Sequence, residues 1–119
     1  MNSEKFVHEW ISAWNSRDLE RILSHYSDDI EITTPMISMA TGNDISTLKG
    51  REAVAAYWSE ALEKLPDLHF ELLDWAEGVD CVSVYYRSVM DLIAIETMWF
   101  DENGRVCRMN ASYRKKTDA

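Results

Sequence analysis

Two charged residues stand inside apolar stretches of the chain. Glu96 lies within "AIETMWF", and Arg87 closes "CVSVYYR". Charged residues are rare in such stretches unless they are paired. A lone buried acid loses its hydration, so its pKa rises and it stays neutral and able to donate a hydrogen bond. We therefore identify Glu96 and Arg87 as candidate catalytic residues. The alternative is a structural salt bridge or, for Arg87, a solvated sheet face.

The position of Arg87 relative to Glu96 depends on the hairpin between them. If Met90 and Asp91 form its centre, Tyr85 lies opposite Glu96, and Arg87 is one diagonal step away on the same face. An ion pair at about 4 Å, in an effective dielectric constant of about 20, would gain roughly 4 kcal/mol before desolvation and would favour an ionised Glu96. Met-Asp is a poor hairpin turn, however, and a slip of one residue moves every side chain to the other face.

A second set of residues has side chains suited to a ligand pocket. Indole and phenol rings combine a large apolar surface with one polar atom, and thioethers adapt to varied apolar ligands. We expect a pocket for a small, mostly apolar molecule with one polar end. The candidate ligand-binding residues are Trp14, Tyr26, Thr34, Trp58, Tyr85, Met98, Met109 and Tyr113. For the aromatic residues and methionines, ordinary core packing is the alternative.

Histidines and cysteines give no sign of a metal or cofactor site. The three histidines have no ligand spacing such as HxxxH, and the two cysteines, Cys81 and Cys107, form no CxxC pattern. The adjacent Asp28 and Asp29 are interpreted as a turn between helix and strand rather than as paired catalytic carboxylates. We expect no bound metal and no cofactor.

The charge balance limits the partners of this chain. Its 119 residues include 12 Lys and Arg against 21 Asp and Glu, a net charge of -9. This charge repels nucleic acid and anionic membranes, so neither is an expected partner. The chain has no apolar run long enough to span a bilayer and no signal-peptide pattern, so we expect a cytoplasmic protein. Its length fits a single domain over residues 1–114, followed by a polar tail, residues 115–119.

Hydrophobic periodicity predicts the elements that position these residues. Helical spacing predicts helices from Ser3 to about Trp14, from about Asp18 to Tyr26 and from Gly50 to Leu65. Alternation with a period of two predicts strands at residues 30–34, 68–76, 81–89, 93–100 and 106–113. Residues 36–49 are expected to form a long loop or a short helical lid. This order indicates an α+β fold, with about three helices packed on the concave face of a cone-shaped, curved antiparallel sheet.

Three stretches resemble the nuclear transport factor 2-like superfamily and, within it, the SnoaL-like and ketosteroid isomerase-like group. They are "AWNSRDLERILSHYSDDIEI", "LKGREAVAAYW" and "FDENGRVCRMNASY". The resemblance implies the cystatin-like cone, a single SnoaL-like domain and a homodimer formed through the convex face of the sheet. Val82, Val84 and Tyr86 are expected to supply an apolar patch on that face.

The ketosteroid isomerases allow a comparison residue by residue. The stretch "YSDDIEITTP" places Thr34 where these enzymes keep their proton-shuttling base. Trp10 matches their tyrosine donor, and Glu96 matches their protonated aspartate. A threonine hydroxyl has no usable basicity near neutral pH, so we do not expect ketosteroid isomerisation.

The resemblance implies instead a SnoaL-like lyase, isomerase or hydrolase acting on a small, largely apolar substrate. Glu96 would be its acid or base, and Arg87 and Tyr26 would orient the substrate or a water molecule. Two alternatives are a non-catalytic ligand-binding module, which the absence of a base at Thr34 favours, and a dimeric scaffold whose cavity is filled by its own aromatic side chains.

Overall fold

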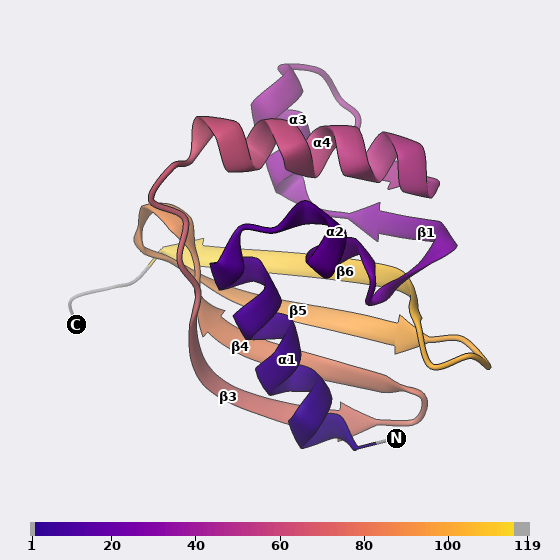
Figure 1. Cartoon of the computed structure of the whole chain (residues 1–119). Coiled ribbons are helices and arrows are strands. Elements are labelled where there is room, and N and C mark those ends of the chain that lie inside the picture. The colour runs from indigo at the N-terminus through magenta and orange to yellow at the C-terminus, as the bar shows by residue number, and fades with distance from the viewer. Residues whose placement is uncertain (1, 116–119) are drawn as a thin grey trace.

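The computed structural model describes residues 2–115 and has an α+β architecture (Figure 1). In chain order, its elements are α1 (Ser3–Ser16), α2 (Leu19–Leu23), β1 (Tyr26–Thr33), α3 (Pro35–Thr41), β2 (Thr47–Lys49), α4 (Arg51–Lys64), β3 (Glu71–Gly78), β4 (Cys81–Arg87), the 3-10 turn η1 (Val89–Asp91), β5 (Leu92–Phe100) and β6 (Val106–Lys115). The predicted α+β class is confirmed. Of the predicted polar tail, Lys115 ends β6, and residues 116–119 lie outside the described residues.

The strands form one six-stranded sheet in the order β2-β1-β6-β5-β4-β3. Neighbouring strands are antiparallel, except that β1 runs parallel to β6. The sequence predicted an antiparallel sheet throughout. Tight hairpins impose the antiparallel direction on β3 to β6, whereas β1 and β6 are far apart in the chain and no short turn fixes their relative direction.

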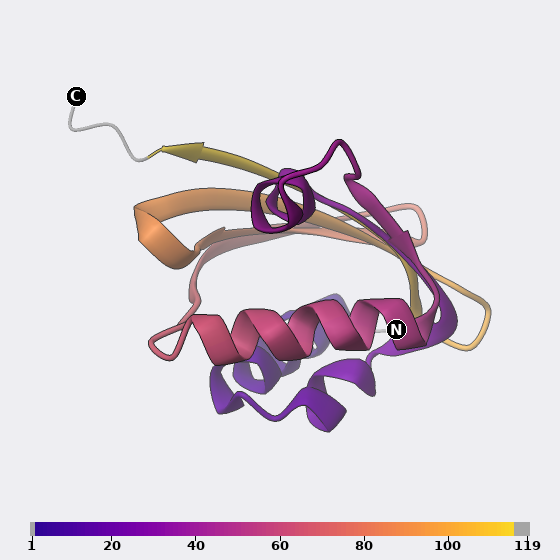
Figure 2. The ribbon, with the colours of Figure 1, turned by 90° about the horizontal axis from the view of Figure 1, so that it is seen from above.

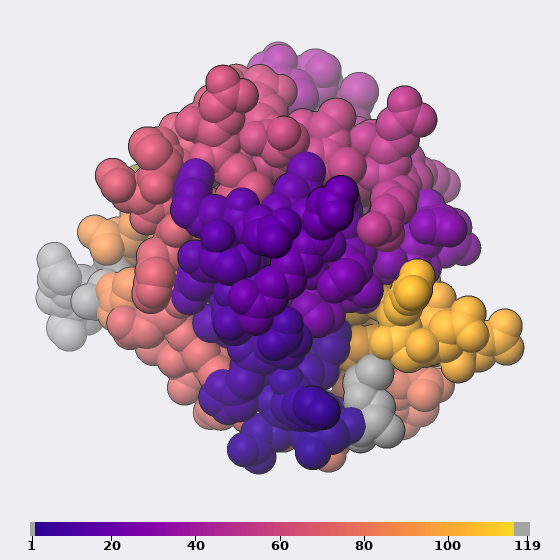
Figure 3. Space-filling view, viewed as in Figure 1, coloured from indigo at the N-terminus to yellow at the C-terminus, as the bar shows by residue number. Residues whose placement is uncertain are grey.

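The sheet curves over the helices, as the view from above shows (Figure 2). Helix α1 buries Val7, Trp10 and Trp14, and α4 buries Val54 and Trp58. The side chains of α1, α2 and α4 cover the side of the molecule on which the helices lie, which faces the viewer in Figure 3. These apolar faces and the concave side of the sheet together form the core.

The ends of α1 are set by local hydrogen bonds. The Asn2 side chain accepts a hydrogen bond from the Lys5 backbone N–H, so Asn2 caps the helix that begins at Ser3. Arg17 closes the helix in a left-handed conformation with a φ of 63°. Its guanidinium then donates to the carbonyl oxygens of Leu62 and Leu65 at the end of α4. The C-termini of the two helices are thereby joined.

The β4–β5 hairpin corrects the predicted register by one residue. Val84, not Tyr85, lies opposite Glu96, and Arg87 lies opposite Ile93. The turn is longer than the expected two-residue centre, because the Ser88 N–H donates to the Leu92 carbonyl and the three residues of η1 lie between them. Within η1, Met90 and Asp91 have left-handed conformations.

This register moves every β4 side chain to the face opposite the one predicted. Val82, Val84 and Tyr86 are buried on the concave face, so the expected apolar patch on the convex face is wrong. Tyr85 and Arg87 lie on the convex face instead, and the predicted pairing of Arg87 with Glu96 is also wrong.

Within residues 2–115, no helix is both long and apolar enough to cross a membrane.

Candidate functional site

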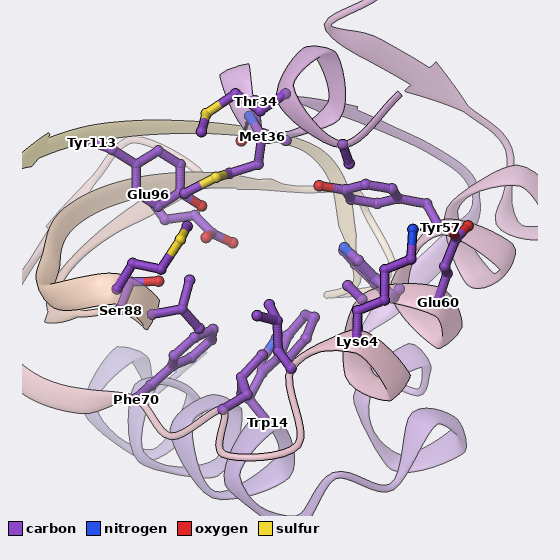
Figure 4. Close-up of a pocket in the computed structure, with 18 of the residues that line it drawn as sticks. Trp14, Thr34, Met36, Tyr57, Glu60, Lys64, Phe70, Ser88, Glu96 and Tyr113 are labelled. Carbon is purple, nitrogen blue, oxygen red and sulfur yellow. Dashed lines mark hydrogen bonds and ion pairs between the residues drawn. The ribbon is translucent and has the colours of Figure 1, made fainter. Parts of the chain in front are cut away.

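A cavity of about 630 Å³ lies between the concave face of the sheet and helices α1, α3 and α4 (Figure 4). A volume in this range suits a small organic ligand. Its walls are mostly apolar, with polar groups gathered at two places. The lining residues include Trp14, Thr34, Met36, Trp58, Glu60, Lys64, Phe70, Tyr86, Ser88, Glu96, Met109 and Tyr113.

The predicted ligand-binding residues divide into three groups. Trp14, Thr34, Trp58, Met109 and Tyr113 line the cavity, together with the candidate catalytic residue Glu96. Two others, Tyr26 and Met98, are fully buried in the core and are not among the lining residues. Tyr85 is on the convex face, where its hydroxyl oxygen accepts a hydrogen bond from Arg114.

Tyr26 is held by an internal hydrogen bond. Its hydroxyl oxygen accepts a hydrogen bond of 2.8 Å from Trp10 Nε1, and both side chains are buried. The hydroxyl is therefore engaged with α1 rather than directed at a ligand. Burial and the nearby Glu96 charge raise the pKa of Tyr26 far above its usual range.

Glu96 is the buried acid of the cavity. It lies in the middle of β5, between Val84 on β4 and Ala111 on β6, and only 4% of its surface is exposed. The Tyr86 hydroxyl donates a hydrogen bond of 2.8 Å to its Oε1 atom. Burial raises the pKa of Glu96 to about 7, and the hydrogen bond from Tyr86 opposes part of that rise. Glu96 can thus both donate and accept a proton near neutral pH.

Two tyrosines share this end of the cavity with Glu96. Tyr113 on β6 points into the cavity beside the Glu96 carboxyl group (Figure 4). Burial first, and then the charge of Glu96, raise the pKa of both Tyr86 and Tyr113. Both phenols therefore remain protonated near neutral pH, and they act as hydrogen-bond donors rather than as bases.

Thr34 lines the cavity but serves as a helix cap. Its Oγ1 accepts a hydrogen bond of 3.2 Å from the Met36 N–H, and Pro35 follows it as the first residue of α3. A threonine before a proline at the start of a helix is a favoured arrangement, because proline has no N–H to leave unpaired there. The segment predicted as a loop or short helical lid thus begins with a helix that this Thr-Pro pair could have indicated.

Arg87 belongs to a surface ion pair. Its Nε atom is 3.7 Å from Glu71 Oε1, and both side chains are partly exposed. The only hydrogen bond to the Glu96 carboxyl among residues 2–115 comes from Tyr86, so the acid has a phenol partner where the sequence predicted a cation. Arg87 therefore has no place in the chemistry of the cavity.

Sequence reasoning missed Tyr86, although a signal was present. Val82, Val84 and Tyr86 alternate with Ser83, Tyr85 and Arg87, and the more apolar set of a half-buried strand faces the core. The prediction instead followed the assumption that Met90 and Asp91 form the hairpin centre, which placed the other set on the concave face. Lys64 was missed because the end of α4 is brought to the cavity only by the tertiary fold.

The acidic groups that the structure describes outside the cavity form no cluster suited to a metal ion. Within the described part of the chain, no three His, Cys, Asp or Glu side chains are grouped so that they could hold a metal ion. Asp28 and Asp29 lie within β1, at an irregularity in its pairing with β6, rather than in the predicted turn. The Ser27 hydroxyl donates to Asp29, and Arg51 lies 3.9 Å from Asp28.

Comparisons with known proteins agree with this architecture. The sequence profile of one family, described as the SnoaL-like domain, matches residues 7–114. A SnoaL-like protein of unknown function from Burkholderia thailandensis is 44% identical, with a TM-score of 0.89 over 93% of this chain and 92% of that one. No curated protein matches the chain.

More distant structures share the fold alone. The epoxide hydrolase/cyclase-like enzyme SalBIII, from pyran ring formation in the polyether salinomycin, is 18% identical, with a TM-score of 0.73 over 93% of this chain and 89% of that one. A protein from Kribbella flavida, named as a candidate ketosteroid isomerase, is 13% identical, with a TM-score of 0.72 over 95% of this chain and 78% of that one. The cystatin-like fold predicted from the sequence is confirmed by such neighbours.

Proposed function

The chain belongs to the SnoaL-like family, and we propose that it binds a small, largely apolar molecule in its cavity and transfers a proton through Glu96 to an oxygen atom of that molecule. One observation carries this proposal. Glu96 is a buried carboxyl group in the cavity wall, held at one oxygen by Tyr86, with a pKa of about 7. Such a group is matched to acid–base chemistry at neutral pH.

The reaction that suits this site begins with protonation of the substrate oxygen. Tyr86 occupies Oε1, so a neutral Glu96 can present a proton from Oε2 to a carbonyl, ether or epoxide oxygen. Tyr113 supplies a second donor beside it. In an epoxide, proton donation accompanies cleavage of the C–O bond, water adds to the carbon atom, and the proton lost by that water returns to Glu96. Elimination or isomerisation would begin with the same donation.

We do not expect ketosteroid isomerisation. Its base would stand at Thr34, whose hydroxyl oxygen is already the acceptor for the first turn of α3. Glu96 is the only carboxyl group that lines this end of the cavity among the described residues. A rate of Δ5 to Δ4 ketosteroid conversion well above that of buffer would contradict this expectation.

A matched pair of naphthalene compounds tests the proposal. 2-Acetylnaphthalene has a single acceptor oxygen and reports binding through calorimetry, while 2-(2-naphthyl)oxirane has the same aromatic body and reports epoxide opening through chromatography. We expect the rate of opening to fall as pH rises through about 7, because the acid form of Glu96 is lost. Glu96→Gln should lower the rate by roughly 10²–10⁴-fold.

Glu71→Gln is the control, because Glu71 is an acid on the surface, outside the cavity. It should leave both binding and the rate unchanged. If neither compound binds, or if Glu96→Gln behaves like Glu71→Gln, the proposal is wrong.

A non-catalytic ligand-binding module is the second candidate function. The use of Thr34 as a helix cap favours it, because the cavity then lacks a second acid–base group opposite Glu96. In that case 2-acetylnaphthalene should bind more weakly as pH rises through about 7, the oxirane should not open, and Glu96→Gln should change affinity alone.

We also propose a homodimer formed through the convex face of the sheet. Tyr85 and Ile95 lie opposite each other there, and 47% of the Ile95 surface is exposed in the single chain. Burial of such side chains would support association. Analytical ultracentrifugation should show a dimer that Ile95→Lys converts to a monomer, and a monomeric wild type would contradict it.

A further inference from the structure

We propose that the cavity also binds organic ammonium ions, with the ionised carboxylate of Glu96 as their counter-ion. The inference deepens the proposed function, since it rests on the same cavity receiving a small molecule at Glu96. It names a class of ligand that the proton-donating role alone does not predict.

The first argument is the missing cation at Glu96. Buried carboxylates in proteins are normally paired with a positive charge. The arginine expected beside Glu96 lies on the other face of the sheet and is paired with Glu71. Tyr86 gives the carboxyl group a neutral donor only. A ligand that brings an ammonium group would complete the pair and recover part of the desolvation cost of the carboxylate.

The second argument is the wall around the carboxyl group. Phe70 and Tyr86 have ring centroids 4.6 Å apart, and Trp14 lies 5.4 Å from Phe70. All three side chains line the same cavity as Glu96. Aromatic rings can attract cations, and they also offer an apolar surface to the carbon skeleton of an organic amine. The apolar part of an amine and its charged group would therefore both find favourable contacts.

The third argument is the charge balance of the cavity. Among the described lining residues, the carboxyl groups belong to Glu60 and Glu96, and the single basic side chain belongs to Lys64. Lys64 is 2.6 Å from Glu60, one turn along α4, on the side of the cavity away from Glu96 (Figure 4). That pair cancels itself, so ionised Glu96 gives the cavity an excess negative charge. The net charge of -9 on the chain also attracts cations toward it.

The groups that face Glu96 keep their charge near neutral pH, so Glu96 controls the pH dependence of ligand binding. They are Tyr86 on β4, Tyr113 on β6 and Tyr26 on β1, and the pKa of each is raised. None of these phenols ionises near neutral pH. Across the cavity, α4 contributes Lys64 and Glu60, which neutralise each other. Between about pH 6 and about pH 8, Glu96 is thus the group beside the ligand that changes charge.

The experiment compares 1-(2-naphthyl)ethylamine with 2-acetylnaphthalene, which has the same carbon skeleton but a carbonyl oxygen in place of the ammonium group. Calorimetric titration of the full chain measures both affinities from about pH 6 to about pH 8. The ionised fraction of Glu96 rises about tenfold over this range, so the amine should bind about tenfold more tightly at the upper end. The ketone should bind about tenfold more weakly there, because it needs the acid form.

Two variants sharpen the result. Glu96→Gln should abolish amine binding and remove the pH dependence of ketone binding, because the amide still donates a hydrogen bond but never ionises. Tyr86→Phe removes the donor that lowers the pKa of Glu96, so the midpoint of amine binding should move to higher pH. This second variant keeps the carboxyl group and tests the proposal even if Glu96→Gln does not fold.

The outcomes for the two probes are separable. If the ketone binds as expected but the amine does not bind, or binds with no rise in affinity toward high pH, the ammonium inference is wrong and the proposed proton donor stands. If the amine binds as expected and the ketone shows no pH dependence, the inference stands and the proposed proton donation is wrong. Amine binding that survives Glu96→Gln would also overturn the inference.

Discussion

The two faces of the sheet, where β3, β4 and β5 lie side by side, place carboxyl groups in opposite environments. On the concave face, the Glu96 carboxyl group and the Tyr86 hydroxyl are buried and joined by a hydrogen bond of 2.8 Å. On the convex face, Arg87 and Glu71 form a looser ion pair of 3.7 Å that is open to solvent. Charge in water is well solvated and contributes little to stability or reactivity, whereas a buried carboxyl group changes its pKa. The raised pKa of Glu96 therefore depends on the face of the sheet on which the residue lies rather than on the number of charges nearby.

The largest effect should come from a large-to-small change on the concave face of β5. Met98 is fully buried, so Met98→Ala should lower the free energy of unfolding by about 2–5 kcal/mol. Ile95 on the same strand faces the other way and is half exposed, and Ile95→Ala should cost less than about 1 kcal/mol at protein concentrations low enough to keep the chain monomeric. Urea unfolding followed by circular dichroism measures both values. Equal costs would mean that the two faces are not distinguished as described.

The second prediction concerns stability and pH. Burial holds the pKa of Glu96 at about 7 in the folded state, against an ordinary value of 4.5. The folded state therefore binds a proton more tightly than the unfolded state does. The stability that this tighter proton binding contributes is fully present below about pH 4.5 and decreases as pH rises toward about 7. Above about pH 7, the free energy of unfolding is lower by about 3 kcal/mol.

Unfolding experiments on Glu96→Gln and Glu71→Gln isolate this contribution from the rest of the titration. Relative to the wild type, Glu96→Gln should become progressively more stable across this pH range, because its amide does not ionise. Glu71→Gln should follow the wild type, since its carboxyl group is exposed. Parallel curves for all three proteins would contradict the assigned burial of Glu96.

A smaller loss of stability is expected at Thr34, where substitutions can distinguish a helix-capping role from a catalytic role. Thr34→Ala removes the cap of α3 and should cost about 1 kcal/mol of unfolding free energy, whereas Thr34→Ser keeps the hydroxyl and should cost less. Thermal unfolding of the two variants gives the difference. A catalytic role for the Thr34 hydroxyl would be indicated instead if Thr34→Ala kept full stability and lost oxirane opening.

The smallest effect should be that of Arg87→Gln. Its ion pair with Glu71 is exposed, and such pairs contribute about 0–1 kcal/mol. The variant should bind 2-acetylnaphthalene with the affinity and pH dependence of the wild type. Loss of binding would restore Arg87 to the site and contradict the strand register.

Sequence reasoning predicted much of the fold because apolar spacing reports which side of a helix or strand is buried. It located α1, α4 and β3 to β6 and identified Glu96 as a buried acid whose pKa is raised. It failed at Arg87 and Tyr85, where the direction of the side chains depends on how the hairpin closes. Two residues with left-handed backbone, Met90 and Asp91, decide that closure, and methionine does not favour this conformation, although aspartate adopts it more readily.

The sequence by itself determined the α+β class, the membership of the chain in its family and the presence of one acid within an apolar strand. The class and the acid follow from periods of two and 3.6 residues, which are local, whereas the family follows from the resemblance of three stretches of sequence. The tertiary structure decided which partner meets that acid. The one-residue change in register exchanged Arg87 for Tyr86, and the meeting of β5 with β4 and β6 added the surrounding phenols. Contacts between strands are long-range, so the step from a buried carboxyl group to a site had to come from the folded chain.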